Sequence, residues 1–108
     1  MGVYSRIRLF NMTLPAIGAD LLSQDIQPIF DMSEFRIHIA VSKAAKLTMK
    51  RKEISTGTSI TENLSSQVFA LDEGVTYTVP TRAIEKYNFS LNVSTGTLWV
   101  LQIDEVAQ

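Results

Sequence analysis

Apolar and polar residues alternate with a period of two over most of this chain. The clearest runs lie at residues 3–10, 35–42, 75–79, 87–93 and 99–103. Because successive side chains of a strand point to opposite faces, each run predicts a strand with one apolar face. Valine, isoleucine, threonine and aromatic residues are frequent in these runs, which is typical of strands. About seven or eight short strands at regular spacing predict an all-β fold, namely an antiparallel β-sandwich of jelly-roll-like form.

Turn signals separate these runs. The tetrapeptide Ser-Thr-Gly-Thr occurs twice, at residues 55–58 and 94–97, and its glycine permits the positive φ of a tight turn. We therefore expect two hairpins, over residues 46–64 and 87–104. A third turn is expected at Asp72-Glu73-Gly74. Pro80 is expected to end a strand before a connection over residues 81–86.

The parity of the runs predicts the core. The residues on the expected inner face are Ile37, Ile39, Val41, Leu47, Tyr77, Phe89, Leu91, Trp99 and Leu101. His38 has the opposite parity to Ile37 and Ile39. We therefore expect it on the outer face of its strand, without partners.

Residues 1–34 differ from the sandwich body predicted over residues 35–108, although both belong to one domain. After the first strand, Pro15, Gly18 and Pro28 punctuate an irregular stretch, in which Thr13 is placed to cap a short helical turn. Its apolar residues follow no clean period; they are Met12, Leu14, Ile17, Leu21, Leu22, Ile26, Ile29 and Phe30. We expect this arm to make contacts with neighbouring copies. The alternative is that it covers an open end of its own sandwich.

Composition limits the class of protein. With 108 residues the chain has room for one domain, and a formal net charge of -1 argues against nucleic-acid binding. The basic cluster is interpreted as a solvated strand face and comprises Lys43, Lys46, Lys50, Arg51 and Lys52. No apolar run is long enough to span a membrane. Arg6 and Arg8 interrupt any signal-peptide core, which predicts synthesis in the cytoplasm.

The chain offers little catalytic chemistry. It has one histidine and no cysteine, so the sequence predicts no catalytic site, no metal site and no cofactor. Asp72 and Glu73 lack the ligand spacing of a calcium loop. All four asparagines (Asn11, Asn63, Asn88 and Asn92) lie in N-x-Ser/Thr sequons, which we interpret as Ser/Thr-rich strand composition. The candidates for a sugar-stacking platform are Trp99, Tyr77, Tyr87, Phe69 and Phe89, for which core packing is the preferred interpretation.

From residue 35 onward the chain resembles small phage and viral β-sandwich proteins of the capsid-decoration or tail-surface type. The similarity rests on segments 35–42 (FRIHIAVS), 47–51 (LTMKR), 61–64 (TENL), the aromatic strand at Tyr77, 87–90 (YNFS) and 101–106 (LQIDEV). The turn before the Tyr-Asn-Phe strand departs from the family's D-x-G pattern, because Ile84-Glu85-Lys86 replaces it. The resemblance implies a virion structural protein without carrying over any functional residue.

These observations predict a virion protein that is not an enzyme. Its expected partners are further copies of itself, as a homotrimer by preference, and other virion proteins such as the major capsid protein. The alternative is a carbohydrate- or ligand-binding β-sandwich module. In that case the protein should be monomeric, and Trp99 should share a flat exposed face with at least one tyrosine.

Overall fold

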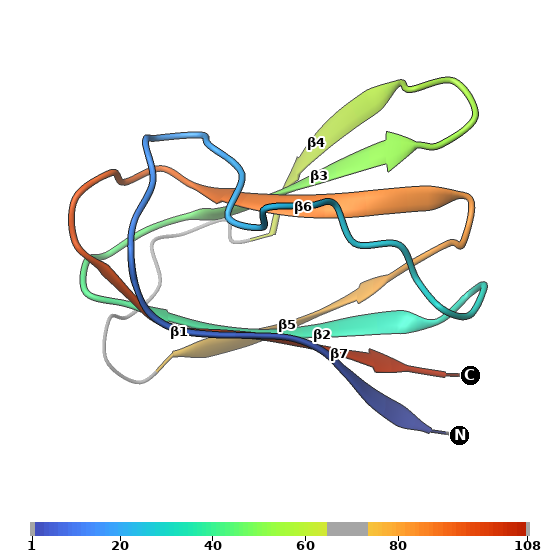
Figure 1. The fold of residues 1–108 in the computed structure, drawn as a ribbon, viewed down its shortest axis with the longest axis horizontal. Coiled ribbons are helices and arrows are strands. Elements are labelled where there is room, and N and C mark those ends of the chain that lie inside the picture. Colours follow the sequence, from blue (N-terminus) through green and yellow to red (C-terminus); the bar gives the residue numbers. More distant parts are fainter. Residues whose placement is uncertain (1, 65–73, 108) are drawn as a thin grey trace.

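The computed structural model describes residues 2–64 and 74–107, and these two ranges form an all-β protein. The strands are β1 (Val3–Thr13), β2 (Glu34–Val41), β3 (Leu47–Glu53), β4 (Ser59–Asn63), β5 (Val75–Pro80), β6 (Glu85–Leu91) and β7 (Thr97–Val106). They make a four-stranded sheet in the order β1-β7-β2-β5 and a three-stranded sheet in the order β4-β3-β6, with every pair antiparallel. The two sheets lie in two layers (Figure 1). The predicted antiparallel β-sandwich is confirmed.

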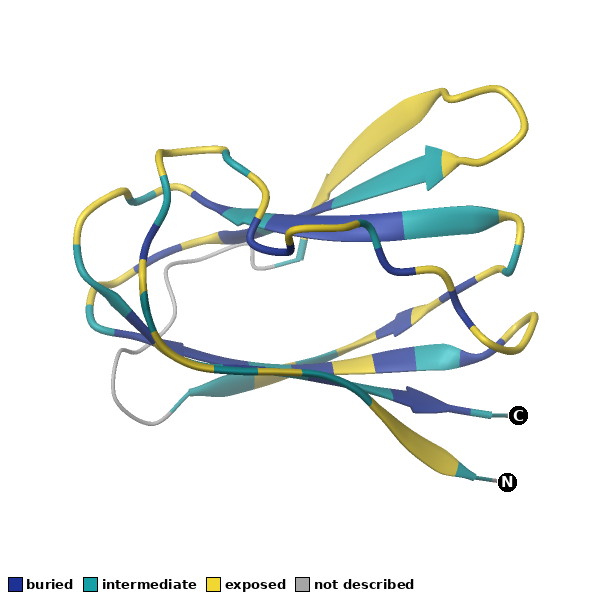
Figure 2. Ribbon diagram, in the orientation of Figure 1, coloured by how far each residue is buried: buried dark blue, intermediate teal, exposed yellow. Residues whose placement is uncertain are grey.

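The core lies between the two layers, and the buried residues of the strands concentrate in β2, β6 and β7 (Figure 2). Most of the predicted core residues are fully or almost fully buried: Ile37, Ile39, Val41, Leu47, Phe89, Leu91 and Leu101. Tyr77 is partly buried and packs against this cluster. Alternating parity thus identified the inner face of most strands correctly.

Trp99 is the exception, because its side chain is 44% exposed. Leu98 and Leu101 are both fully buried although they are three residues apart, so the alternation breaks between them. The register of β7 against β2 shifts at the same place, between Ala40 and Val41. A β-bulge adds one residue to a strand and redirects a side chain. The prediction of Trp99 as a core residue is therefore wrong, because the bulge turns it to the outer side of the sheet.

The two predicted hairpins have different outcomes. β3 and β4 pair as expected around the turn at residues 54–58. The hairpin over residues 87–104 is wrong, because β6 pairs with β3 while β7 pairs with β1 and β2 in the other sheet. The loop between them crosses from one layer to the other.

Gly96 of this loop lies close to the end of β2. A Cβ on Gly96 would lie 2.5 Å from the Ser42 Oγ, which accepts a hydrogen bond from the Thr97 amide at 2.7 Å. Because Gly96 has no side chain, the loop can pass close to Ser42, which follows β2.

The connection from β1 to β2 follows the free edge of β6 (Figure 1). The Leu21 amide donates to the Phe89 carbonyl at 2.7 Å, and Ile26 and Tyr87 each donate to the other's carbonyl at 2.8 Å. Asn88 fastens the same segment, because its side chain bonds both the amide and the carbonyl of Leu22 at 3.0 Å. The connection therefore closes the edge of β6 with main-chain hydrogen bonds.

This packing overturns part of the expectation for the arm. Leu14, Leu21, Leu22 and Ile26 are buried in the core of their own chain, so the interpretation that neighbouring copies cover them is wrong. The short helical turn expected after Thr13 is instead a reverse turn. The Ala19 amide donates to the Ala16 carbonyl at 3.0 Å, and Gly18 has a φ of 78°.

The remaining local expectations concern turns. β5 ends at Pro80 as predicted, whereas β6 begins at Glu85, inside the stretch expected as a connection. The turn expected at Asp72-Glu73-Gly74 lies mostly outside the described residues, since only Gly74 is described. No helix in the described ranges is long and apolar enough to cross a membrane.

Candidate functional site

A buried carboxylate organises one end of the sandwich. Glu105 lies on the inner face of β7, in line with Leu101 and Ile103, and its side chain has no exposed surface. It accepts hydrogen bonds from the amides of Ile29 (2.9 Å) and Phe30 (3.0 Å). A buried charge is tolerated only when its hydrogen-bonding capacity is met, and these bonds fix the end of the β1–β2 connection against β7.

Two side chains complete this environment. The Ser33 hydroxyl donates to Glu105 at 2.7 Å, and the Arg6 guanidinium forms an ion pair with the same carboxylate. Arg6 lies where the register of β1 against β7 shifts, between Ser5 and Ile7. Because this β-bulge inserts one residue, the Arg6 side chain turns inward to meet Glu105. Its second terminal nitrogen donates to the Gln27 carbonyl at 2.8 Å.

These contacts set the pKa of Glu105. Burial alone would raise the pKa of this carboxyl. The Ile29 and Phe30 amides, the Ser33 hydroxyl and Arg6 together outweigh burial and lower it below the usual 4.5. The folded state therefore favours the charged carboxylate. Its contribution to stability is complete above the usual pKa and is lost as the pH falls through the lowered value.

We expect an acid-sensitive stability that depends on this group. Between about pH 7 and pH 3, the urea midpoint should fall less steeply for Glu105→Gln than for the wild type, since the variant lacks the titrating group. The pKa of Asp31 is also lowered, by a hydrogen bond from Arg82. Because Asp31 is present in both the wild type and the variant, its effect on stability cancels when the two proteins are compared. Equal pH slopes for the two chains would show that Glu105 does not carry the effect.

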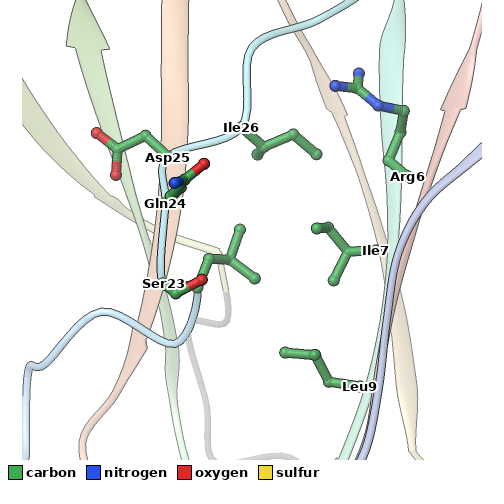
Figure 3. Close-up of a pocket in the computed structure, with 8 residues that line it drawn as sticks. Arg6, Ile7, Leu9, Ser23, Gln24, Asp25 and Ile26 are labelled. Carbon is green, nitrogen blue, oxygen red and sulfur yellow. The ribbon is translucent and has the colours of Figure 1, made fainter.

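A pocket of about 270 Å³ opens between β1 and the connection that covers β6. Ile7 and Leu9 of β1 face Ile26 across it (Figure 3). Its remaining lining residues are Arg6, Leu22, Ser23, Gln24 and Asp25. The pocket is therefore apolar where it meets the core and polar along the segment 23–25. Because small-molecule sites usually have volumes of about 300–1,000 Å³, this pocket is small for one.

The outer face of the four-stranded sheet carries two large exposed aromatic residues. Phe10 is 58% and Trp99 44% exposed. Val100 lies beside Trp99 in β7 and pairs with both Phe10 of β1 and Ala40 of β2, so these residues form one apolar end of the face. Ala40 is buried, so we call the exposed Phe10 and Trp99 with the half-buried Val100 the aromatic patch. Exposed aromatic side chains on a flat face are typical of surfaces that bind another molecule.

The predicted outer position of His38 is confirmed, since its strand neighbours Ile37 and Ile39 are fully buried. The expectation that it has no partner is wrong, because its Nδ1 lies 2.9 Å from the Thr76 Oγ1 on β5. In the described part of the chain, no three histidine, aspartate or glutamate side chains gather as metal ligands.

Two residues of the basic cluster, Lys50 and Arg51, are paired with acids. The Lys50 Nζ lies 3.0 Å from Asp20 and 3.9 Å from Asp25. Arg51 is 3.5 Å from Glu62 and 3.9 Å from Glu85. These pairs reduce the positive charge that Lys50 and Arg51 could present to a phosphate backbone.

Arg51 also belongs to a second polar cluster, between the layers. Its guanidinium carbon lies 5.7 Å from the centre of the Tyr87 ring, and the Tyr87 hydroxyl donates to Glu85 at 2.9 Å. Burial, followed by the hydrogen bond to Glu85, raises the pKa of Tyr87 to about 12. The phenol therefore stays protonated at neutral pH and serves as a structural donor.

Two residues considered for a sugar-stacking platform, Tyr87 and Phe89, are buried and therefore cannot stack on a sugar. Phe69, Asp72 and Glu73 lie outside the described residues. Two of the sequon asparagines have structural hydrogen bonds. Asn88 is buried and bonds the amide and carbonyl of Leu22, and the Asn92 Oδ1 accepts a hydrogen bond from the Lys46 amide at 2.7 Å.

Sequence reasoning missed Glu105 and Arg6. A signal was present for Glu105, because it continues the core-facing parity of Leu101 and Ile103. An acid at a core position indicates a buried carboxylate that needs donors. Arg6 gave no such signal, since only the bulge brings it inward.

Comparisons with known proteins give no relative: no family model, no curated protein and no solved structure matches the chain.

Proposed function

We propose that this protein is a non-catalytic structural component of a virus particle, of the capsid-decoration or minor-capsid type. It would be made in the host cytoplasm and bind the particle as a homo-oligomer, preferentially a trimer, in contact with the major capsid protein. The proposal assigns no role to nucleic acid or membrane. The observation that carries it is the aromatic patch, an exposed apolar end on the outer face of a rigid sheet.

The patch suits protein association for energetic reasons. Aromatic side chains are enriched in the buried centres of interfaces, and they lose little conformational entropy when they become ordered. Each large apolar side chain that is buried contributes about 1.5–3 kcal/mol. Phe10 and Trp99 lie on neighbouring strands of the four-stranded sheet, whose hydrogen bonds hold them in place before binding.

We expect the intact chain to sediment as a trimer at micromolar concentration, and Trp99→Glu to sediment as a monomer. A charge at the patch would have to be desolvated in the interface, which is costly. Ile60→Glu is the matched control, since Ile60 is also exposed but lies on β4 in the other sheet. This control should remain a trimer. A monomeric wild type, or a trimeric Trp99→Glu, would contradict association through the patch.

The exposure of Trp99 also favours a second candidate, a carbohydrate-binding module. Against it, no tyrosine shares that face in the described part of the chain: Tyr4 contacts Phe30, and Tyr77 and Tyr87 pack against or within the core. A sugar site would give a monomer whose tryptophan fluorescence changes on addition of glycans. Sedimentation and fluorescence titration together separate the two functions.

A further inference from the structure

The edge of β1 differs from the edge of β6 on the same side of the sandwich. The β1–β2 connection covers the β6 edge with main-chain hydrogen bonds. In the described residues, β1 pairs with β7 alone, so its other edge has no strand beside it. An uncovered edge presents unpaired amide and carbonyl groups that another extended chain can bind.

The pocket described above lies directly beneath this edge, with Ile7 and Leu9 of β1 forming one wall (Figure 3). A strand added beside β1 would point alternate side chains into the space between the layers. The volume of about 270 Å³ exceeds that of a cavity that holds a benzene-sized group, about 150 Å³, and falls below that of most small-molecule sites. The pocket therefore fits an aliphatic side chain of a peptide better than a separate small ligand.

The geometry of β1 limits the length of such a peptide. The register shift between Ser5 and Ile7 interrupts the strand on one side, and Asn11, with a φ of 52°, interrupts it on the other. The regular stretch is Ile7–Phe10. Bulges of this kind discourage long edge-to-edge pairing between sheets while leaving room for a short segment.

The charged residues of β1 indicate which kind of peptide would bind beside it. β1 carries Arg6 and Arg8 and no acidic residue. Arg6 is held by Glu105, whereas Arg8 is exposed and, among the described residues, forms no ion pair with an acid. Pairing β1 with a second copy of itself would bring arginines together, which is unfavourable. An acidic residue of the peptide would instead lie near Arg8, on the outer face.

We propose that the β1 edge and the pocket beneath it bind a short extended peptide from another protein, with alternating aliphatic and acidic residues. The peptide adds as a fifth strand to the four-stranded sheet. One aliphatic side chain enters the pocket beside Ile7 and Leu9, and the acidic side chains face Arg8. This inference does not rest on the proposed function, because it concerns the edge of the sheet and not the aromatic patch.

The test uses the intact chain and two synthetic heptapeptides, Thr-Val-Glu-Leu-Glu-Val-Thr and the same peptide with lysine in place of glutamate. Binding is followed by the shifts of backbone amide resonances. We expect the glutamate peptide to bind with a dissociation constant below about 1 mM, at least tenfold more tightly than the lysine peptide. The perturbed amides should centre on Ile7–Phe10. No binding at about 1 mM peptide, equal affinity for the two peptides, or perturbation centred on β4 or β5 would overturn the proposal.

Two variants with matched controls test the contacts. Arg8→Glu should reverse the preference to the lysine peptide, whereas Arg36→Glu, an exposed arginine two strands away, should leave it unchanged. Ser23→Trp places a large side chain at the pocket rim and should weaken binding at least tenfold, while the exposed Ser94→Trp should not. Loss of binding in the control variants, or its retention in Arg8→Glu and Ser23→Trp, would overturn the proposal.

Discussion

Replacing Glu105 with glutamine is expected to lower the free energy of unfolding by about 3–5 kcal/mol, the usual cost of removing one partner from a buried ion pair. The variant leaves the Arg6 guanidinium without its carboxylate. It also replaces a charged acceptor of the Ile29 and Phe30 amides with a neutral one. Because a domain of this size is stable by about 5–15 kcal/mol, the loss is a large fraction of the total.

Urea unfolding measures this effect, with Asp104→Asn as the control. Asp104 is the neighbouring residue on β7, and its carboxylate accepts only a hydrogen bond from Gln102, at 3.1 Å, among the contacts of the described residues. Its replacement should change stability by no more than about 0.5 kcal/mol. A Glu105→Gln chain as stable as Asp104→Asn would show that the carboxylate does not hold the connection in place.

Deleting residues 1–34 is expected to abolish the fold. The deletion removes β1 from the four-stranded sheet and takes Leu14, Leu21, Leu22 and Ile26 out of the core. At about 1.5–3 kcal/mol for each buried side chain, these four residues contribute about as much as the whole stability of a small domain.

Circular dichroism of residues 35–108 should therefore show an unfolded chain. A separate peptide of residues 1–34 should restore the β-sheet spectrum when mixed with it, because the lost contacts are core packing and main-chain hydrogen bonds to β6 and β7, which need no covalent link. A truncated chain that keeps the spectrum and a cooperative thermal transition would mean that the arm is dispensable for folding.

The fold follows from the sequence where side chains obey strict alternation, as in Ile37, Ile39 and Leu47, which are all fully buried. Prediction failed where one residue breaks the period. The bulge at Trp99 depends on pairing with β2, and a run considered alone carries no sign of it. The loop containing Gly96 has the composition of a hairpin turn, yet it crosses between layers, because tertiary pairing and not turn chemistry decides which sheet receives β7.

The candidate surfaces depend on the same irregularities. The bulge in β7 exposes Trp99 in the aromatic patch, and the bulge in β1 turns Arg6 toward Glu105. The sequence contained one usable signal, the acid at a core-facing position in β7. The position of the pocket required knowledge of how residues 22–26 lie against β1, which arises from contacts distant in the sequence.

The proposed role of this chain is that of a structural component of a virus particle. Electron cryomicroscopy of particles from the source of this sequence, labelled with an antibody raised against the purified chain, tests it most directly. If the proposal is correct, label should appear at regularly repeated positions, over density that fits this two-layered sandwich in groups of three. Particles that carry no label, with the chain recovered only as a free monomer, would contradict it.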